Sequence, residues 1–237
     1  MAERELCIHH HLGLGDHFDC HGMVRYMLKN FDFGKVYVFS KSNYFNMVEY
    51  MYRDEDNIEV IKIDKNLNEY DQVSSFLKAN ESIHFLRVGF DQYPSGREVQ
   101  DNKNCWEYFY EQVQIPPKVR TDYFYVERDE EAESNLLKEL NPGNKPYIFV
   151  HDDPERGHEI DMKKLTNDFL VIRNDNTKNI FHFIKVLEDA EEIHCMESSF
   201  KSLIDFYAKT ADLYYHDFRG HPLGEKTNRE WTIVDYA

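Results

Sequence analysis

The chain has 237 residues, of which 41% are hydrophobic and 15% aromatic, so it can form the core of one large domain or of two small ones. Its 28 basic and 44 acidic residues give a net charge of −16, and a surface of that sign repels nucleic acid and anionic lipid. No run of about 18 apolar residues marks a transmembrane helix, the start "MAEREL" is too charged for a signal peptide, and the 4 scattered cysteines are typical of reduced thiols, so a cytoplasmic location is expected.

The first half of the chain alternates short apolar segments with helical patterns. Apolar segments predict strands, and periodic apolar residues between them predict helices. The predicted strands are 5–11, 35–41, 58–64 and 82–90. The predicted helices are 19–31, 43–54, 70–80 and 105–115. This alternation is typical of βαβ units and predicts a parallel sheet covered by helices.

The second half repeats the alternation after a proline stop at Pro116–Pro117. Its predicted strands are 146–151, 169–174, 191–197 and 211–218. Its predicted helices include 177–190 and 198–210. We therefore predict an α/β protein with two Rossmann-like domains, residues 1–115 and 116–237.

A glycine-rich turn, Gly13-Leu-Gly15-Asp16, follows the first predicted strand. Backbone N–H groups and the positive end of the next helix can receive a phosphate there. A dinucleotide fingerprint needs a glycine where Phe18 stands and an acidic end to the second strand, so NAD binding is disfavoured. No Gly-Lys-Ser/Thr sequence is present, which excludes a P-loop. The alternative is that both glycines only make a tight turn.

The run His9-His10-His11 does not predict a metal site. Consecutive strand residues point to opposite faces, so the three side chains cannot share one ion. No further ligand stands at a suitable spacing, and no metal is expected. His11 ends the predicted strand, where ligands of open α/β sheets bind, and is a candidate for substrate contact. The alternative is a hydrogen-bonded histidine packed under the loop.

Asp16 comes just after the glycine-rich turn, at the mouth of the predicted sheet. A carboxylate at that place can accept a proton from a substrate hydroxyl. It can also cap the following helix, a role that Asp19 could fill instead. The sequence leaves both alternatives open.

Arg156 follows strand 146–151 and is the candidate anion clamp of the second half. Its guanidinium matches the oxygens of a phosphate in a fork. The alternative is an ion pair with Asp152, Asp153 or Glu155.

Polar residues also follow strand 191–197. Glu197 ends it and could hold the two hydroxyls of a ribose, as acidic residues at strand ends do. Ser198 and Ser199 open the next helix, where serines either cap the helix or bind phosphate.

Two segments carry a resemblance to a known family. The segment "HHHLGLGDHFDCHGMVRYML" resembles the N-terminal motif of GT-B glycosyltransferases of the heptosyltransferase type. The segment "IHCMESSFKSLIDFYAKTADLYY" resembles the nucleotide-binding motif of their second domain. In place of the family's Thr-x-Asp-(Ser/Thr)-Gly-x-x-His it has "CMESSFKS", which looks closer to fucosyltransferase-like relatives, so the donor sugar is not carried over.

The resemblance implies a compact GT-B fold, with two Rossmann-like domains that face each other across a cleft. Residues 1–115 would hold a glycan or glycoconjugate acceptor, and residues 116–237 a nucleotide-diphosphate sugar, with UDP or GDP expected. It also implies inverting, metal-independent transfer with no further cofactor. Asp16 matches the proposed base of the family. The implied nucleotide-sugar contacts are Gly13, Gly15, Arg156, Glu197, Ser198 and Ser199, and the candidate acceptor contacts are His11, His17 and Arg97.

Two other classes of function remain open on the sequence. A nucleotide-sugar epimerase or hydrolase on similar domains would turn over the donor without an acceptor. A non-catalytic nucleotide- or glycan-binding protein would bind the same ligands and turn over none.

Overall fold

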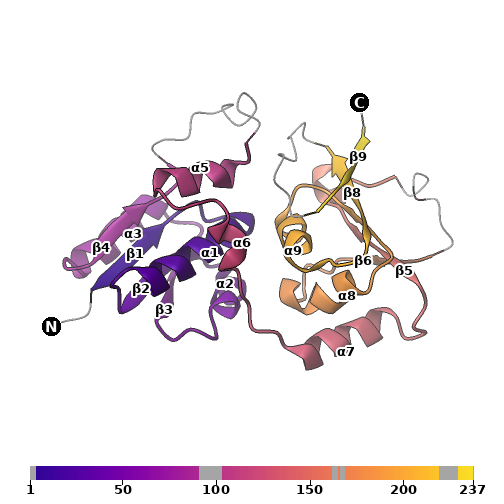
Figure 1. The fold of residues 1–237 in the computed structure, drawn as a ribbon, viewed down its shortest axis with the longest axis horizontal. Helices are drawn as coiled ribbons and strands as arrows, with labels where there is room; N and C mark the ends of the chain where they lie inside the picture. Colours follow the sequence, from indigo (N-terminus) through magenta and orange to yellow (C-terminus); the bar gives the residue numbers. More distant parts are fainter. Residues whose placement is uncertain (1–3, 91–102, 162–164, 166–168, 219–228, 237) are drawn as a thin grey trace. The chain divides into compact units, whose positions relative to one another are not determined.

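The structure is a computed structural model that describes residues 4–90, 103–161, 165, 169–218 and 229–236 (Figure 1). The chain folds into two compact units, Met1–Glu127 and Arg128–Ala237. Each unit contains one parallel β-sheet together with helices. The predicted α/β class with two parallel sheets is therefore confirmed.

Unit 1 contains a four-stranded parallel sheet in the order β3-β2-β1-β4. Its strands are β1 (Glu5–His9), β2 (Lys35–Lys41), β3 (Ile58–Ile63) and β4 (His84–Arg87). Its helices are α1 (Leu14–Asn30), α2 (Phe45–Met51), α3 (Glu69–Ala79), α5 (Cys105–Gln112) and α6 (Val119–Asp122). Cys7 of β1, Phe39 of β2 and Val73 of α3 are buried together, so α3 covers one face of the sheet.

The start of α1 corrects the sequence prediction. The helix begins at Leu14, not at residue 19, and β1 ends at His9, not at residue 11. Leu14 and the next turn bury apolar and aromatic side chains, which outweighs the helix-interior cost of about 1 kcal/mol for Gly15. The predicted glycine loop is therefore mostly helix, and Asp16 lies inside the first turn.

The division between the units falls later than the boundary predicted at residues 115 and 116. The prolines at 116 and 117 end one helical segment, but the next helix, α6, packs back on α1 (Figure 1). The buried guanidinium of Arg120 pairs with Asp19 of α1 at 2.9 Å and lies 4.8 Å from the ring centre of Trp106. These contacts hold α6 in unit 1, and Arg53 donates to the backbone oxygen of Glu127 at 2.9 Å, where the unit ends.

Helices α1 and α6 approach closely at Gly22. A Cβ atom there would lie 2.4 Å from the backbone oxygen of Val119 and 2.8 Å from that of Arg120. Gly22→Ala should therefore lower the free energy of unfolding by about 1–3 kcal/mol, measured by urea denaturation. Gly15→Ala is the matched control in the same helix, because its Cβ would meet nothing within 4 Å. Equal stability of the two variants would contradict the close approach.

Unit 2 contains a five-stranded parallel sheet in the order β6-β5-β7-β8-β9. Its strands are β5 (Tyr147–His151), β6 (Leu170–Arg173), β7 (Glu192–Cys195), β8 (Asp212–Asp217) and β9 (Thr232–Asp235). Its helical segments are α7 (Glu130–Leu140), η1 (Pro154–Arg156), η3 (Ile180–Phe183), α8 (Ile184–Glu188) and α9 (Ser199–Tyr207). Phe149, Phe183 and Phe200 bring β5, η3 and α9 together in the core.

A hydrogen-bonded chain crosses the buried part of this sheet. His194 Nδ1 lies 3.0 Å from His216 Nε2, His194 Nε2 lies 3.2 Å from a Glu192 oxygen, and His216 Nδ1 lies 2.8 Å from the Tyr236 hydroxyl. An ionised carboxylate only accepts, so with neutral rings His194 donates to Glu192, His216 donates to His194, and Tyr236 donates to His216. These hydrogen bonds thus attach Tyr236, the residue after β9, to strands β7 and β8.

Candidate active site

The strand orders locate one candidate site at the carboxyl edge of each sheet. In unit 1 the chain runs from β1 to β2 on one side and later returns to β4 on the other side. In unit 2 it does the same around β5, with β6 on one side and β7 on the other. Ligands of open parallel sheets bind at the carboxyl ends of the strands where the order reverses. The segment that contains Asp16 follows β1, and the segment that contains Ser198 follows β7.

The side chain of Asp16 is fixed over the start of α1. Gly13 is the N-cap residue, so neither Asp16 nor Asp19 holds that position. The carboxylate of Asp16 instead accepts hydrogen bonds from the backbone N–H groups of Gly13 and of Asp16 itself. A Cβ atom on Gly13 would lie 2.6 Å from Asp16 Oδ2, so glycine is what allows this approach. Asp16 remains 26% exposed and can be reached by a ligand.

The pKa of Asp16 is raised from 3.8 to about 7. Burial of the carboxylate is the largest cause, and the negative charge of Asp19 adds to it. The backbone hydrogen bonds and the charge of Lys41 oppose the rise. A carboxylate with this pKa is ionised in a large fraction of molecules at neutral pH and is basic enough to accept a proton.

The two histidine candidates lie at different depths. His11 is partly exposed, with Nδ1 3.9 Å from an oxygen of Asp16 and its ring against Phe90 and Phe109. His17 is fully buried and packs edge-on against His10, with ring centres 4.7 Å apart. Burial holds the pKa of His17 well below its usual value, so the ring stays neutral. The structure therefore corrects the expectation for His17, which lies beneath the site, and keeps His11 as a candidate contact.

Sequence reasoning missed the connection of three polar residues at the same edge, which are Glu69, His9 and Lys41. Glu69, the first residue of α3, bridges the ends of two strands: Oε1 lies 2.8 Å from His9 Nε2 and Oε2 lies 3.1 Å from Lys41 Nζ. These bonds lower the pKa of Glu69 against the effect of its burial, and keep it ionised. A lysine that ends a strand was the available signal, since strand ends meet at this edge.

In unit 2, Ser198 is the N-cap of α9, and its hydroxyl accepts from the backbone N–H of Lys201 at 3.4 Å. Ser199 is the first residue of the helix, where backbone N–H groups have no partner within the helix. Glu197 precedes the cap and accepts from the Tyr215 hydroxyl at 3.5 Å. The three predicted residues thus stand together at the carboxyl end of β7, with the capping role of Ser198 observed.

Arg156 makes the ion pair that was its alternative role. Its side chain is 69% exposed and pairs with Asp153 at 3.2 Å. Arg173, which ends β6, was missed by sequence reasoning and is the more firmly held cation: its guanidinium lies 2.6 and 2.7 Å from the two oxygens of buried Asp152. Asp152 also accepts from the backbone of Ile160, so both groups are fixed at this edge.

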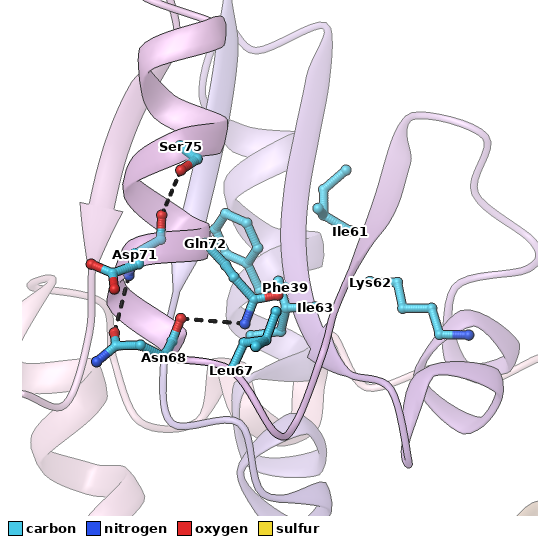
Figure 2. A pocket seen from close by; sticks show the side chains of 9 residues that line it. All are labelled: Phe39, Ile61, Lys62, Ile63, Leu67, Asn68, Asp71, Gln72 and Ser75. Carbon is cyan, nitrogen blue, oxygen red and sulfur yellow. Dashed lines mark hydrogen bonds between the residues drawn. The ribbon is translucent and has the colours of Figure 1, made fainter.

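An open cavity of about 490 Å³ lies elsewhere, between β3 and α3 of unit 1 (Figure 2). Its apolar wall includes Phe39 and Ile61. Its polar groups are engaged locally: Asn68 accepts from the backbone of Asp71, and Gln72 donates to the backbone oxygen of Asn68. None of the candidate site residues that the structure describes lines this cavity.

Three observations concern the described part of the chain alone. Arg97, a candidate acceptor contact, lies outside the described residues. Among residues 4–90, 103–161, 165, 169–218 and 229–236, no group of three His, Cys, Asp or Glu side chains is placed to hold a metal ion. No helix within these ranges is long and apolar enough to cross a membrane.

A scan against protein-family models and a search of curated proteins found no match to this sequence. Solved structures do match. The glycosyl transferase family 9 protein of Veillonella parvula DSM 2008 has a TM-score of 0.58 and 8% identity, over 98% of this chain and 86% of that one. E. coli ADP-heptose LPS heptosyltransferase II has a TM-score of 0.57 and 9% identity, over 97% of this chain and 90% of that one. The iron-containing dodecameric glycosyltransferase TibC of enterotoxigenic E. coli H10407 has a TM-score of 0.57 and 12% identity, over 98% of this chain and 62% of that one.

The chain therefore has the fold of glycosyltransferases. More particularly, it is similar in structure to family 9 enzymes of the heptosyltransferase type, so the resemblance seen in the sequence motifs is confirmed. At 8–12% identity this likeness defines the fold and leaves the chemistry to the residues of the site.

Proposed function

We propose that the protein is a glycosyltransferase that moves a sugar from a nucleotide-diphosphate sugar to a hydroxyl of a glycan or glycoconjugate. The observation that carries the proposal is the carboxylate of Asp16. It is fixed and partly open at the carboxyl edge of the unit 1 sheet, and its pKa is about 7. A general base for a hydroxyl needs this combination of access and basicity.

In the proposed reaction Asp16 accepts the proton of the acceptor hydroxyl while the hydroxyl oxygen attacks the anomeric carbon of the donor. The bond between that carbon and the diphosphate oxygen breaks, and the nucleoside diphosphate leaves with the electron pair. One displacement inverts the configuration of the anomeric carbon, so we propose an inverting enzyme.

We further propose that unit 2 binds the donor and stabilises the leaving diphosphate without a metal ion. The start of α9 offers backbone N–H groups and the positive end of a helix dipole, and Arg173 or Arg156 offers a guanidinium. We assign the ribose hydroxyls to Glu197, because it directly precedes the N-cap of α9.

Nucleotide binding is the first test of this assignment. We expect ADP, UDP or GDP to raise the melting temperature, since a ligand at 100 times its Kd stabilises by about 2.7 kcal/mol. UDP and GDP follow from the sequence resemblance, and ADP is included because the similar E. coli enzyme is named for ADP-heptose. Absence of a shift with all three would contradict the donor site.

A charge variant tests the place of binding. Ser199→Asp puts a carboxylate at the start of α9, where the helix dipole tolerates it but a diphosphate is repelled. We expect it to fold and to lose the nucleotide shift. Ser74→Asp, which adds the same charge at an exposed position of α3, should keep the shift. Retention of the shift in Ser199→Asp would indicate that the nucleotide does not bind at the start of α9.

Turnover then separates the three classes of function. A transferase releases the nucleoside diphosphate from its donor in proportion to added acceptor. Release of the nucleoside diphosphate at full rate without acceptor would indicate a hydrolase. Conversion of the donor sugar to its epimer, with no such release, would indicate an epimerase. Binding with no turnover of any donor would indicate a binding protein.

A further inference from the structure

A lysine ammonium is held firmly at the edge of the unit 1 sheet. Lys41 ends β2, and its Nζ pairs with Glu69 at 3.1 Å. The other oxygen of Glu69 is held by His9, whose side chain is 1% exposed, at 2.8 Å. Glu69 accepts from one of the three donors of the ammonium, and the Lys41 side chain is 35% exposed. The ammonium of Lys41 is thus held by Glu69 and remains accessible to solvent.

An exposed aromatic ring adjoins this network. Tyr70, next to Glu69 in α3, is 50% exposed, and its ring centre lies 6.0 Å from that of His9. The guanidinium of Arg87 lies 5.0 Å from the Tyr70 ring centre and donates to the Tyr70 hydroxyl at 2.9 Å. These contacts hold the ring in place, although the residue is half exposed.

The network belongs to the surroundings of the candidate base. The charge of Lys41 lowers the pKa of Asp16 and that of His11, so the ammonium lies within electrostatic reach of both. His9 ends β1, the strand after which the segment with Asp16 follows. Phe90 links the groups as well, since its ring packs against His9, His11 and Tyr70.

We propose that Lys41 and Tyr70 form a subsite for the sugar ring of the acceptor, with Glu69 and His9 as positioning residues. A pyranose has one apolar C–H face, which suits an exposed aromatic ring, and a rim of hydroxyls, which suits an ammonium donor. The occupant is a neutral or anionic sugar, since neither group demands a charge. The subsite rests on the proposed function only in that it places this sugar beside Asp16.

The test uses the full chain and a panel of methyl glycosides of glucose, galactose, mannose, fucose and N-acetylglucosamine. Binding is measured by saturation-transfer difference NMR. We expect at least one glycoside to bind wild type, and Lys41→Gln and Tyr70→Ala each to weaken that binding about tenfold, the size of a charge-assisted hydrogen bond or a ring contact. Tyr70→Trp keeps a ring and should keep binding.

Two matched variants control for general effects. Lys35 begins the same strand, has the same 35% exposed side chain and pairs with Glu59 at 2.5 Å. Tyr125 is 54% exposed and has the guanidinium of Arg25 5.4 Å from its ring centre. Lys35→Gln and Tyr125→Ala should bind the glycoside as wild type does.

Each outcome decides between the proposals. Equal binding by Lys41→Gln, Tyr70→Ala and wild type would overturn the subsite, and so would the absence of any bound glycoside. A nucleotide shift with no glycoside binding would leave the proposed transferase standing without this subsite. Glycoside binding that depends on Lys41 and Tyr70, with no shift from any nucleotide, would support the subsite and overturn the transferase.

Discussion

Asp16→Asn should lower the rate of sugar transfer by about 10²–10⁴, the usual contribution of a positioned general base. The amide keeps an oxygen that can accept from the backbone of Gly13 but cannot take up the proton of the acceptor. The measurement is the release of nucleoside diphosphate at saturating donor and acceptor. The nucleotide-induced thermal shift should be unchanged, because the proposed donor site lies in unit 2. Full activity in Asp16→Asn or Asp16→Ala would contradict its role as the base.

The pH profile gives this prediction a second readout. The base acts in its ionised form, so kcat should rise with pH through about 7 and level off above it. Asp19 raises the pKa of Asp16, so Asp19→Asn should move the rise to lower pH; the amide oxygen can still accept from Arg120. Lys41 lowers that pKa, so Lys41→Gln should move the rise to higher pH. A profile that neither variant moves would indicate that another group limits the rate.

The position of Asp16 at the edge of the sheet could be predicted from the sequence, because the order of strand, turn and helix determines it. Its surroundings could not. Glu69 lies 60 residues from His9 in the chain, and only the folding of α3 against the sheet brings the two together. Arg173 was hidden for the same reason, since the pairing of β5 with β6 places it opposite Val150, within reach of Asp152 two residues later.

Local patterns misled the prediction where burial decides the structure. The segment around Gly13 and Gly15 has the composition of a loop, yet α1 includes Gly15 because Leu14 and Phe18 are buried. The proline pair at 116–117 has the composition of a linker, yet α6 after it packs on α1. Glycine and proline affect only the local free energy of a backbone conformation, by about 1–3 kcal/mol. Tertiary contacts worth a few kcal/mol exceed that local cost.

Acid should destabilise unit 1, because three of its buried histidines, His10, His17 and His21, are completely shielded from solvent and neutral. Burial lowers the pKa of His10 to about 4 and, with the charge of Arg25, that of His21 to about 3; it also holds the pKa of His17 well below its usual value. Histidine in an unfolded chain titrates near a pKa of about 6.5. Below that pH the unfolded chain binds protons that the folded chain does not. The stabilisation is fully present above about pH 6.5 and is lost as the pH falls toward the folded pKa values.

One carboxylate opposes this loss. The folded pKa of Asp16, about 7, exceeds its usual 3.8, so the folded chain takes up that proton first as the pH falls. Each histidine removes about 1.4 kcal/mol of stability per pH unit below its unfolded pKa, and Asp16 returns a similar amount between its two pKa values. Three histidines outnumber one carboxylate, so the net effect of these four groups is a loss of stability as the pH falls from 6 to 4.

His17→Leu isolates one histidine of this set. Neither ring nitrogen of His17 has a hydrogen-bond partner among the described residues, and the side chain is fully buried, so leucine removes a titrating group without breaking a bond. The chain has 2 tryptophans, so in a Trp231→Phe background Trp106 reports the unfolding of unit 1. Urea denaturation at pH 7.5, 6.0 and 5.0 should show equal slopes above about pH 6.5 and, below it, a pH slope smaller by about 1.4 kcal/mol per unit in His17→Leu. His84→Gln, at an exposed position of β4, should keep the wild-type slope. Identical slopes in all three proteins would mean that His17 is protonated in the folded state, and its neutral burial under Asp16 would then be wrong.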